Sequence, residues 1–199
     1  MKGPSLLLFD LGGVLIENSG FERLNVLLPE PIRIDALKKR WLASSLVRRF
    51  ELGHIPADEF AERFVADWEF SCSPEEFLEE FVSWPKGFYP GAQKLLADLR
   101  QVHRVGCLSN SNVLHWEKFG GLEGHFDVAL SSHVLGVIKP DQECFERALH
   151  VCGVEANEVL FFDDSIANVL GARRLGIRAW HVNGVEELKL ALRKEGLLQ

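Results

Sequence analysis

Short apolar runs that end in polar residues are the clearest pattern along the 199-residue chain. Runs without polar alternation are typical of strands that are buried on both faces, as in a parallel sheet. We therefore expect strands within the segments LLLF (6–9), VGCL (105–108), FDVALSS (126–132), VLFF (159–162) and AWHV (179–182).

Helical patterns separate these runs. In AQKLLADLR (92–100) the three leucines share one face, and QECFERALHVCG (142–153) has apolar residues at helical spacing. Asp141 is the predicted N-cap of the second helix, and Gly153 is its predicted stop. The alternation of strands and helices predicts an α/β fold with a doubly wound parallel sheet.

The region 17–84 shows no comparable apolar run, but its aromatic residues recur at helical intervals. Within it, SPEE at 73–76 is a capping box with proline at the first helical position. We therefore expect an all-helical cap domain at 17–84, inserted into a core domain formed by 1–16 and 85–199. Its place in the chain predicts a lid over the carboxyl end of the first strand.

The composition of the chain indicates which classes of binding partner to expect. The formal net charge of −7, without a basic tail, argues against nucleic acid or an anionic membrane and favours a small molecule. The four cysteines form no CxxC motif, and the seven histidines form no HxH or HExxH motif, so we expect reduced thiols and no zinc site. The apolar run before Asp10 is too short for a signal peptide, and no stretch approaches the ~18 apolar residues of a membrane span. A cytoplasmic location is expected, and no feature predicts an oligomeric state.

Polar residues at the strand ends form a candidate site. In an open parallel sheet, ligands bind beyond the carboxyl ends of the strands. The residues that this geometry brings together are Asp10, Ser109, Asn110, Lys139, Asp163 and Asp164. Carboxylates at ~4 Å repel one another by several kcal/mol without a cation. Mg²⁺ is the expected cofactor, because it prefers carboxylate, carbonyl and water oxygens and leaves positions free for a substrate phosphate.

Four motifs, FDLGGVL, CLSNSN, IKPD and FFDDSIANVLGARRLGI, resemble those of the haloacid dehalogenase (HAD) superfamily, in order and over nearly the whole chain. The helical insert resembles the cap of its subfamily I members. The chain is also similar to small phosphatases that act on sugar phosphates such as glucose 1-phosphate, and to the N-terminal phosphatase domain of soluble epoxide hydrolase. The resemblance implies a HAD-like Rossmannoid core and a Mg²⁺-dependent phosphatase acting on a small phosphorylated metabolite, such as a sugar phosphate.

The resemblance also implies a role for each residue at the metal and the reacting phosphorus. Asp10 would be the nucleophile that forms an aspartyl-phosphate, which water then hydrolyses. Mg²⁺ would be held by the carboxylates of Asp10 and Asp164 and by the main-chain carbonyl of Gly12. The Ser109 hydroxyl would take part in catalysis by binding a phosphate oxygen.

The resemblance also implies that Asn110 and Lys139 bind the substrate, with Lys139 as a further catalytic residue, and that Asp163 and Asn168 support the site. The Asn110 N–H would bind phosphate oxygens, and Lys139 would offset the charge of the nucleophile and the phosphoryl group. Asp163 would either lie behind the metal ligands or act as a supplementary acid, and Asn168 would help to orient the loop that carries Asp163 and Asp164.

Gly12 departs from the superfamily pattern. Most phosphatases of the superfamily carry a second aspartate there, which protonates the leaving group and later activates water. Loss of this acid/base would lower the rate by about 10² to 10⁴ if nothing replaced it. A water, or the side chain of Glu17, His54 or His115, could stand in. The glycine pair after Asp10 indicates that backbone must approach a ligand there or take a positive φ.

Two other functions fit parts of the sequence. A 2-haloacid dehalogenase also lacks an aspartate at the Gly12 position and needs no metal, but such enzymes replace the acids of the fourth motif, and FFDDS keeps both. The second alternative is a catalytically weak phosphate-binding module. Gly12 supports it, whereas the intact Asp10, Lys139 and Asp164 oppose it.

Overall fold

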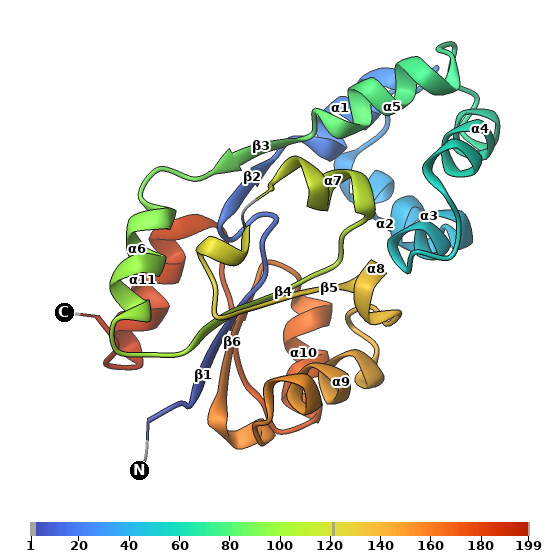
Figure 1. Ribbon diagram of the computed structural model, residues 1–199. Coiled ribbons are helices and arrows are strands. Elements are labelled where there is room, and N and C mark those ends of the chain that lie inside the picture. The colour runs from blue at the N-terminus through green and yellow to red at the C-terminus, as the bar shows by residue number, and fades with distance from the viewer. Residues whose placement is uncertain (1–2, 121, 199) are drawn as a thin grey trace.

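A parallel five-stranded sheet lies at the centre of the computed structural model, which describes residues 3–120 and 122–198 (Figure 1). The strand order is β5-β4-β1-β6-β7, and every neighbouring pair is parallel. The strands are β1 (Leu6–Phe9), β4 (Val105–Ser109), β5 (Val128–Ser131), β6 (Val159–Asp163) and β7 (Arg178–His181). Each predicted segment overlaps one of them, although β4 and β6 extend one residue beyond their segments and β7 begins one residue earlier than predicted. The order reverses beside the central β1, which is where doubly wound sheets bind ligands.

Helices cover both faces of this sheet, which confirms the predicted α/β layering (Figure 1). One face packs on α6 (Ala92–Arg100) and α11 (Gly184–Lys194), and the other on α9 (Gln142–Cys152) and α10 (Ile166–Arg174). In β1, Leu7 and Phe9 enter the first core and the other two residues enter the second. This double burial explains why the run has no polar alternation.

Five helices lie between β2 (Ile16–Asn18) and β3 (Pro85–Phe88) and form the helical insert (Figure 1). They are α1 (Gly20–Leu27), α2 (Ile34–Ala43), α3 (Ser45–Glu51), α4 (Ala57–Asp67) and α5 (Pro74–Val82). Strands β2 and β3 pair antiparallel and form a ribbon that leads to the insert and back. The sequence analysis missed this ribbon and assigned residues 17 and 18 to an all-helical region. The division into domains at 16/17 and 84/85 stays a prediction.

Aromatic side chains form the core of the helical insert. Phe60 is 0% exposed, and its ring centroid lies 4.1 Å from that of Phe50 and 5.0 Å from that of Phe64. The predicted capping box is confirmed, because the Ser73 hydroxyl accepts the N–H of Glu76 at 3.2 Å and the Glu76 carboxylate accepts the N–H of Ser73 at 2.8 Å. The aromatic residues recur at helical spacing because they pack against one another inside the insert.

Two short helices that follow strands β4 and β5 contact the helical insert. They are α7 (Val113–Lys118) and α8 (Ser132–Leu135), and two 3₁₀ turns span Leu122–Gly124 and Ala156–Glu158. The ammonium of Lys118 donates to the carbonyls of Val82, at 2.7 Å, and Pro85, at 2.8 Å. Helix α8 packs on α3 of the insert.

Asp141 stands at the predicted N-cap of α9, but its carboxylate pairs with the guanidinium of Arg48 in α3. The predicted capping by its side chain is therefore wrong, and Asp141 instead joins the core to the insert. Gly153 ends α9 in the left-handed conformation, as predicted. Within residues 3–120 and 122–198, no helix is long and apolar enough to cross a membrane.

The aromatic core of the insert predicts a large loss of stability on truncation of its central ring. Phe60→Ala should lower the free energy of unfolding by about 3–5 kcal/mol, because it removes a buried ring and leaves a cavity. Urea denaturation measures the change. Leu42→Ala is the control, since Leu42 is 73% exposed and its loss should change stability by about 0.5 kcal/mol or less. Equal effects of the two substitutions would contradict the packing described.

Candidate functional site

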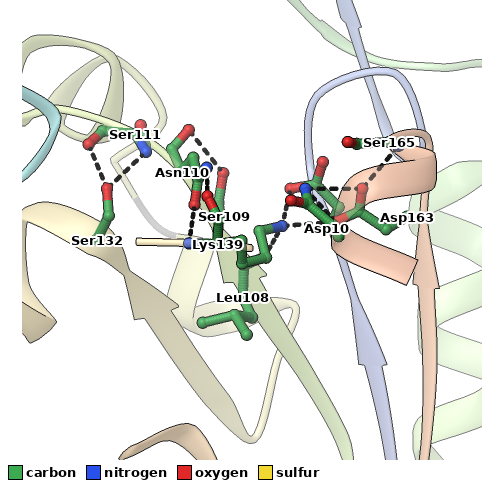
Figure 2. Close-up of polar contacts among 10 residues, drawn as sticks. Asp10, Leu108, Ser109, Asn110, Ser111, Ser132, Lys139, Asp163 and Ser165 are labelled. Atoms are coloured by element: carbon green, nitrogen blue, oxygen red, sulfur yellow. Dashed lines mark hydrogen bonds and ion pairs between the residues drawn. The ribbon is translucent and has the colours of Figure 1, made fainter. Parts of the chain in front are cut away.

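Three neighbouring strands end in polar residues at one edge of the sheet. Asp10 follows β1 directly, Ser109 is the last residue of β4, and Asp163 is the last residue of β6. Because β1 lies between β4 and β6, these ends are adjacent. Lys139 comes from the segment between α8 and α9, and its side chain points at Asp10 and Asp163 (Figure 2). The sequence prediction that these residues converge therefore agrees with the structure.

The ammonium group of Lys139 is buried among three oxygen acceptors. Its Nζ atom lies 2.6 Å from the carbonyl oxygen of Leu108, 2.7 Å from Oδ2 of Asp163 and 3.0 Å from Oδ1 of Asp10. Burial alone would lower the pKa of Lys139, but the carboxylates of Asp10 and Asp163 outweigh burial and raise it. Lys139 is therefore a permanent positive charge at the centre of the site.

Asp163 is fully buried and is fixed from several sides. Besides Lys139, its carboxylate accepts the backbone N–H of Ser165 at 2.8 Å and the amide of Asn168 at 3.0 and 3.1 Å. The predicted orienting role of Asn168 has a direct geometric basis in these contacts. Asp163 orients the Lys139 ammonium, and Asn168 orients Asp163.

Asn110 fixes the backbone of Lys139. Its side-chain amide donates to the Lys139 carbonyl at 2.9 Å, and its Oδ1 atom accepts the Lys139 N–H at 3.0 Å. The neighbouring Ser109 is 5% exposed, with its hydroxyl 3.5 Å from the Asn110 carbonyl. This pairing ties the segment before α9 to the end of β4 (Figure 2).

Three carboxylates meet beside this lysine. Asp10, Asp163 and Asp164 each offer an oxygen, and the three atoms lie within 4.8 Å of one another. Burial raises the pKa of Asp10, with smaller increases from Asp163 and Asp164 and an opposing effect of Lys139. Burial, followed by the charge of Asp163, also raises the pKa of Asp164. One ammonium cannot balance three acids, so this oxygen cluster fits a divalent cation such as Mg²⁺.

The two glycines after Asp10 have different constraints. Gly13 has a φ of 74°, and a Cβ atom there would lie 2.4 Å from Oδ2 of Asp164, which is a severe clash. A Cβ atom at Gly12 would instead have Nδ2 of Asn18 as its neighbour, at an ordinary 3.7 Å. The predicted positive φ is therefore confirmed for Gly13, whereas the approach of backbone to a ligand stays a prediction and Gly12 has room for a Cβ atom.

His115 is fixed as a neutral ring between the core and the insert. Its Nε2 atom lies 2.8 Å from the carbonyl oxygen of Phe81, and its Nδ1 atom lies 3.2 Å from Nδ2 of Asn112. Burial lowers the pKa of His115 to about 4. A ring with both nitrogens engaged and this pKa is a poor proton donor at neutral pH.

The other two proposed replacements for the missing acid lie elsewhere. His54 is exposed and lines a surface cavity together with His133, and Glu17 is exposed on β2. Neither position brings the side chain into contact with Asp10 among the interactions of the described residues.

A cavity of about 170 Å³ separates the helical insert from the core. Asn110 lines it from the core, and Trp41, Glu51 and Trp84 line it from the insert or its edge. Burial raises the pKa of the half-buried Glu51 to about 7, although a hydrogen bond from Trp41 opposes this effect. The sequence analysis missed Glu51, because no motif marks it and its position depends on how α3 packs against the core.

The chain resembles known proteins over most of its length. A family model for haloacid dehalogenase-like hydrolases matches residues 4–176. Phosphatase MT3486 of Mycobacterium tuberculosis is 31% identical over 145 residues, which cover 70% of this chain and 59% of that protein. D-ribitol-5-phosphate phosphatase of Bacteroides thetaiotaomicron is 26% identical over 188 residues, covering 87% and 89% of the two chains. This chain thus spans less than two thirds of the first relative.

A solved structure shows the same fold. The magnesium complex of the HAD family enzyme bt-2542 from Bacteroides thetaiotaomicron superposes with a TM-score of 0.79 at 24% identity. The match covers 96% of this chain and 100% of that chain. It confirms the expected α/β architecture over the 96% of the chain that superposes.

The neutral His115 predicts a pH dependence of stability. Its folded-state pKa lies below the ordinary value of about 6.5, so the unfolded chain binds the proton more readily. Stability should be full above about pH 6.5 and should fall as the pH drops from there towards 4. Replacing His115 by Gln should reduce the difference in unfolding free energy between pH 7.5 and pH 5 by about 1–2 kcal/mol. Urea denaturation at the two pH values measures it.

The exposed His150 provides the matched control for this experiment. His150→Gln should leave the wild-type pH dependence in place. If His115→Gln and wild type showed the same pH dependence, the neutral state of the half-buried His115 would be wrong.

Proposed function

Because the chain belongs to the haloacid dehalogenase-like hydrolase family, we propose that it is a Mg²⁺-dependent phosphatase that hydrolyses a small phosphoester through an aspartyl-phosphate. The observation that carries this proposal is the group of three acids around the buried ammonium of Lys139. The names of two relatives, phosphatase MT3486 and D-ribitol-5-phosphate phosphatase, support it. A sugar phosphate or sugar-alcohol phosphate is the substrate class that we propose.

Asp10 is the nucleophile in this proposal. One of its carboxylate oxygens bonds to phosphorus while the bond from phosphorus to the leaving oxygen breaks, and water then cleaves the aspartyl-phosphate. The Ser109 hydroxyl and the Asn110 N–H bind phosphate oxygens. Lys139 offsets the charge that the nucleophile and the phosphoryl group bring together in a buried site.

The metal would be held by the carboxylates of Asp10 and Asp164 and by the main-chain carbonyl of Gly12. A Mg²⁺ ion held there would supply positive charge that stabilises the phosphoryl oxygens. Asp163 is kept by Ser165 and Asn168 in contact with Lys139, so its role in the proposal is to position that ammonium.

The proposal also covers the domain organisation, the partner and the location of the protein. The helical segment 17–84 acts as the cap that covers the site, and residues 1–16 and 85–199 form the catalytic core. The partner is a small phosphorylated metabolite, and a cytoplasmic location belongs to the same proposal.

The acids at 163 and 164 also separate this proposal from a 2-haloacid dehalogenase. Two carboxylates beside the nucleophile would repel both a carboxylate substrate and a departing halide ion. The weak binding module remains the alternative to turnover, and hydrolysis measurements distinguish the two.

We expect wild-type protein to hydrolyse p-nitrophenyl phosphate in the presence of Mg²⁺ and to lose this activity in excess chelator. Asp10→Asn should lower kcat by about 10³-fold or more, because the amide is a poor nucleophile. Steady-state release of nitrophenolate is the measurement. Asp67→Asn, at an exposed position in α4, is the control and should match wild type.

Two outcomes would contradict the proposal. Hydrolysis that continues in excess chelator would argue against a metal-dependent phosphatase. Activity that is equal in wild type and Asp10→Asn would remove Asp10 from the reaction and support a silent binding module.

A further inference from the structure

Asn18 lies between the surroundings of Gly12 and the cavity that separates part of the insert from the core. A Cβ atom at Gly12 would contact Nδ2 of Asn18 at 3.7 Å, and Asn18 also lines the cavity of about 170 Å³. Asn110, at the phosphate-binding end of the proposed site, lines the same cavity. A group that lines this cavity therefore shares its surroundings with Asn110 at the site and with Asn18 beside Gly12.

Glu51 is such a group. It is the last residue of α3, and among the described residues that line the cavity it is the one carboxylic acid. The Ser132 hydroxyl, at the start of α8, lies 2.5 Å from the carbonyl oxygen of Glu51. Phe50, 2% exposed, anchors the preceding turn of α3 in the aromatic core of the insert. The carboxyl group is therefore carried by a well-anchored backbone.

The electrostatic surroundings of Glu51 suit a group that both gives and takes a proton. Burial raises the pKa of Glu51 to about 7, against the hydrogen bond from Trp41 and the charges of Arg48 and Lys139. The influence of Lys139 shows that the carboxyl lies within electrostatic reach of the buried ammonium. A carboxyl with a pKa near 7 is matched to general acid and base catalysis at neutral pH.

We propose that Glu51 performs the acid/base step for which Gly12 offers no side chain, an inference that rests on the phosphatase function proposed above. The protonated carboxyl gives its proton to the leaving oxygen as the bond from that oxygen to phosphorus breaks and the Asp10–phosphorus bond forms. The resulting carboxylate then takes a proton from water as the water oxygen bonds to phosphorus and the Asp10–phosphorus bond breaks. Inorganic phosphate leaves, and Asp10 and Glu51 return to their starting states.

The test compares two leaving groups in the Glu51→Gln variant, with Mg²⁺ present. An alkyl phosphate such as glucose 6-phosphate needs a proton on its leaving oxygen, so its kcat should fall by about 10²-fold or more. A nitrophenolate ion leaves without protonation. With p-nitrophenyl phosphate the variant should therefore keep a rapid first turnover, seen as a burst of nitrophenolate, followed by slow turnover because the aspartyl-phosphate accumulates.

Two further variants complete the design. Glu62→Gln removes an exposed acid from α4 and should behave as wild type with both substrates. Gly12→Asp in the Glu51→Gln background should restore at least about tenfold of the lost alkyl-phosphate turnover, because it returns a carboxyl group to the position beside Asp10, where a Cβ atom meets no neighbour closer than 3.7 Å. The retained burst also shows that Glu51→Gln is folded.

The outcomes separate this inference from the phosphatase proposal. Alkyl-phosphate turnover within threefold of wild type in Glu51→Gln would overturn the role of Glu51 and leave the phosphatase proposal standing. Loss of the burst together with a raised KM for both substrates would show that Glu51 only holds the substrate, and would overturn it too. If wild type shows no Asp10-dependent hydrolysis of either substrate, both proposals fail together.

Discussion

The buried ammonium of Lys139 is the interaction on which the rest of the site depends. It contacts the end of β4 through the carbonyl of Leu108 and the ends of β1 and β6 through Asp10 and Asp163. Two carboxylates could not be buried side by side without it, since removal of one partner from such a group costs about 3–5 kcal/mol. The ammonium group of Lys139 thus holds the ends of three strands together and raises the electrostatic potential at Asp10.

Each part of this lysine is held separately. The side chain of Asn110 forms hydrogen bonds with the backbone of Lys139. The ammonium group of Lys139 donates to Asp163, and the carboxylate of Asp163 is fixed by Asn168 and by the backbone N–H of Ser165. Short-range contacts at both ends of the Lys139 side chain therefore fix the position of its ammonium group. Because the side chain is already ordered, Lys139 loses less conformational entropy when an anion binds. Precise placement of charge before the substrate arrives is what electrostatic catalysis requires.

The sheet and the core of the site could be predicted from the sequence, because both follow from local pattern and simple geometry. Buried strands such as β1 need apolar residues on both faces, and parallel strands bring their terminal polar residues to one edge. The ribbon of β2 and β3 could not be predicted, since it is short and pairs Ile16 with Phe88 across the whole insert. Glu51 was missed for a related reason, because its place over the cavity depends on the packing of α3 against α8.

The unequal surroundings of the two glycines after Asp10 give them unequal freedom to change during evolution. Gly13 is locked, since any side chain there would collide with Asp164 and adopt an unfavourable φ. A Cβ atom at Gly12 makes only an ordinary contact with Asn18 and takes no unfavourable φ. Descendants of this chain could therefore gain or lose an ionisable group next to the nucleophile in one mutational step, while the loop that carries the nucleophile stays the same.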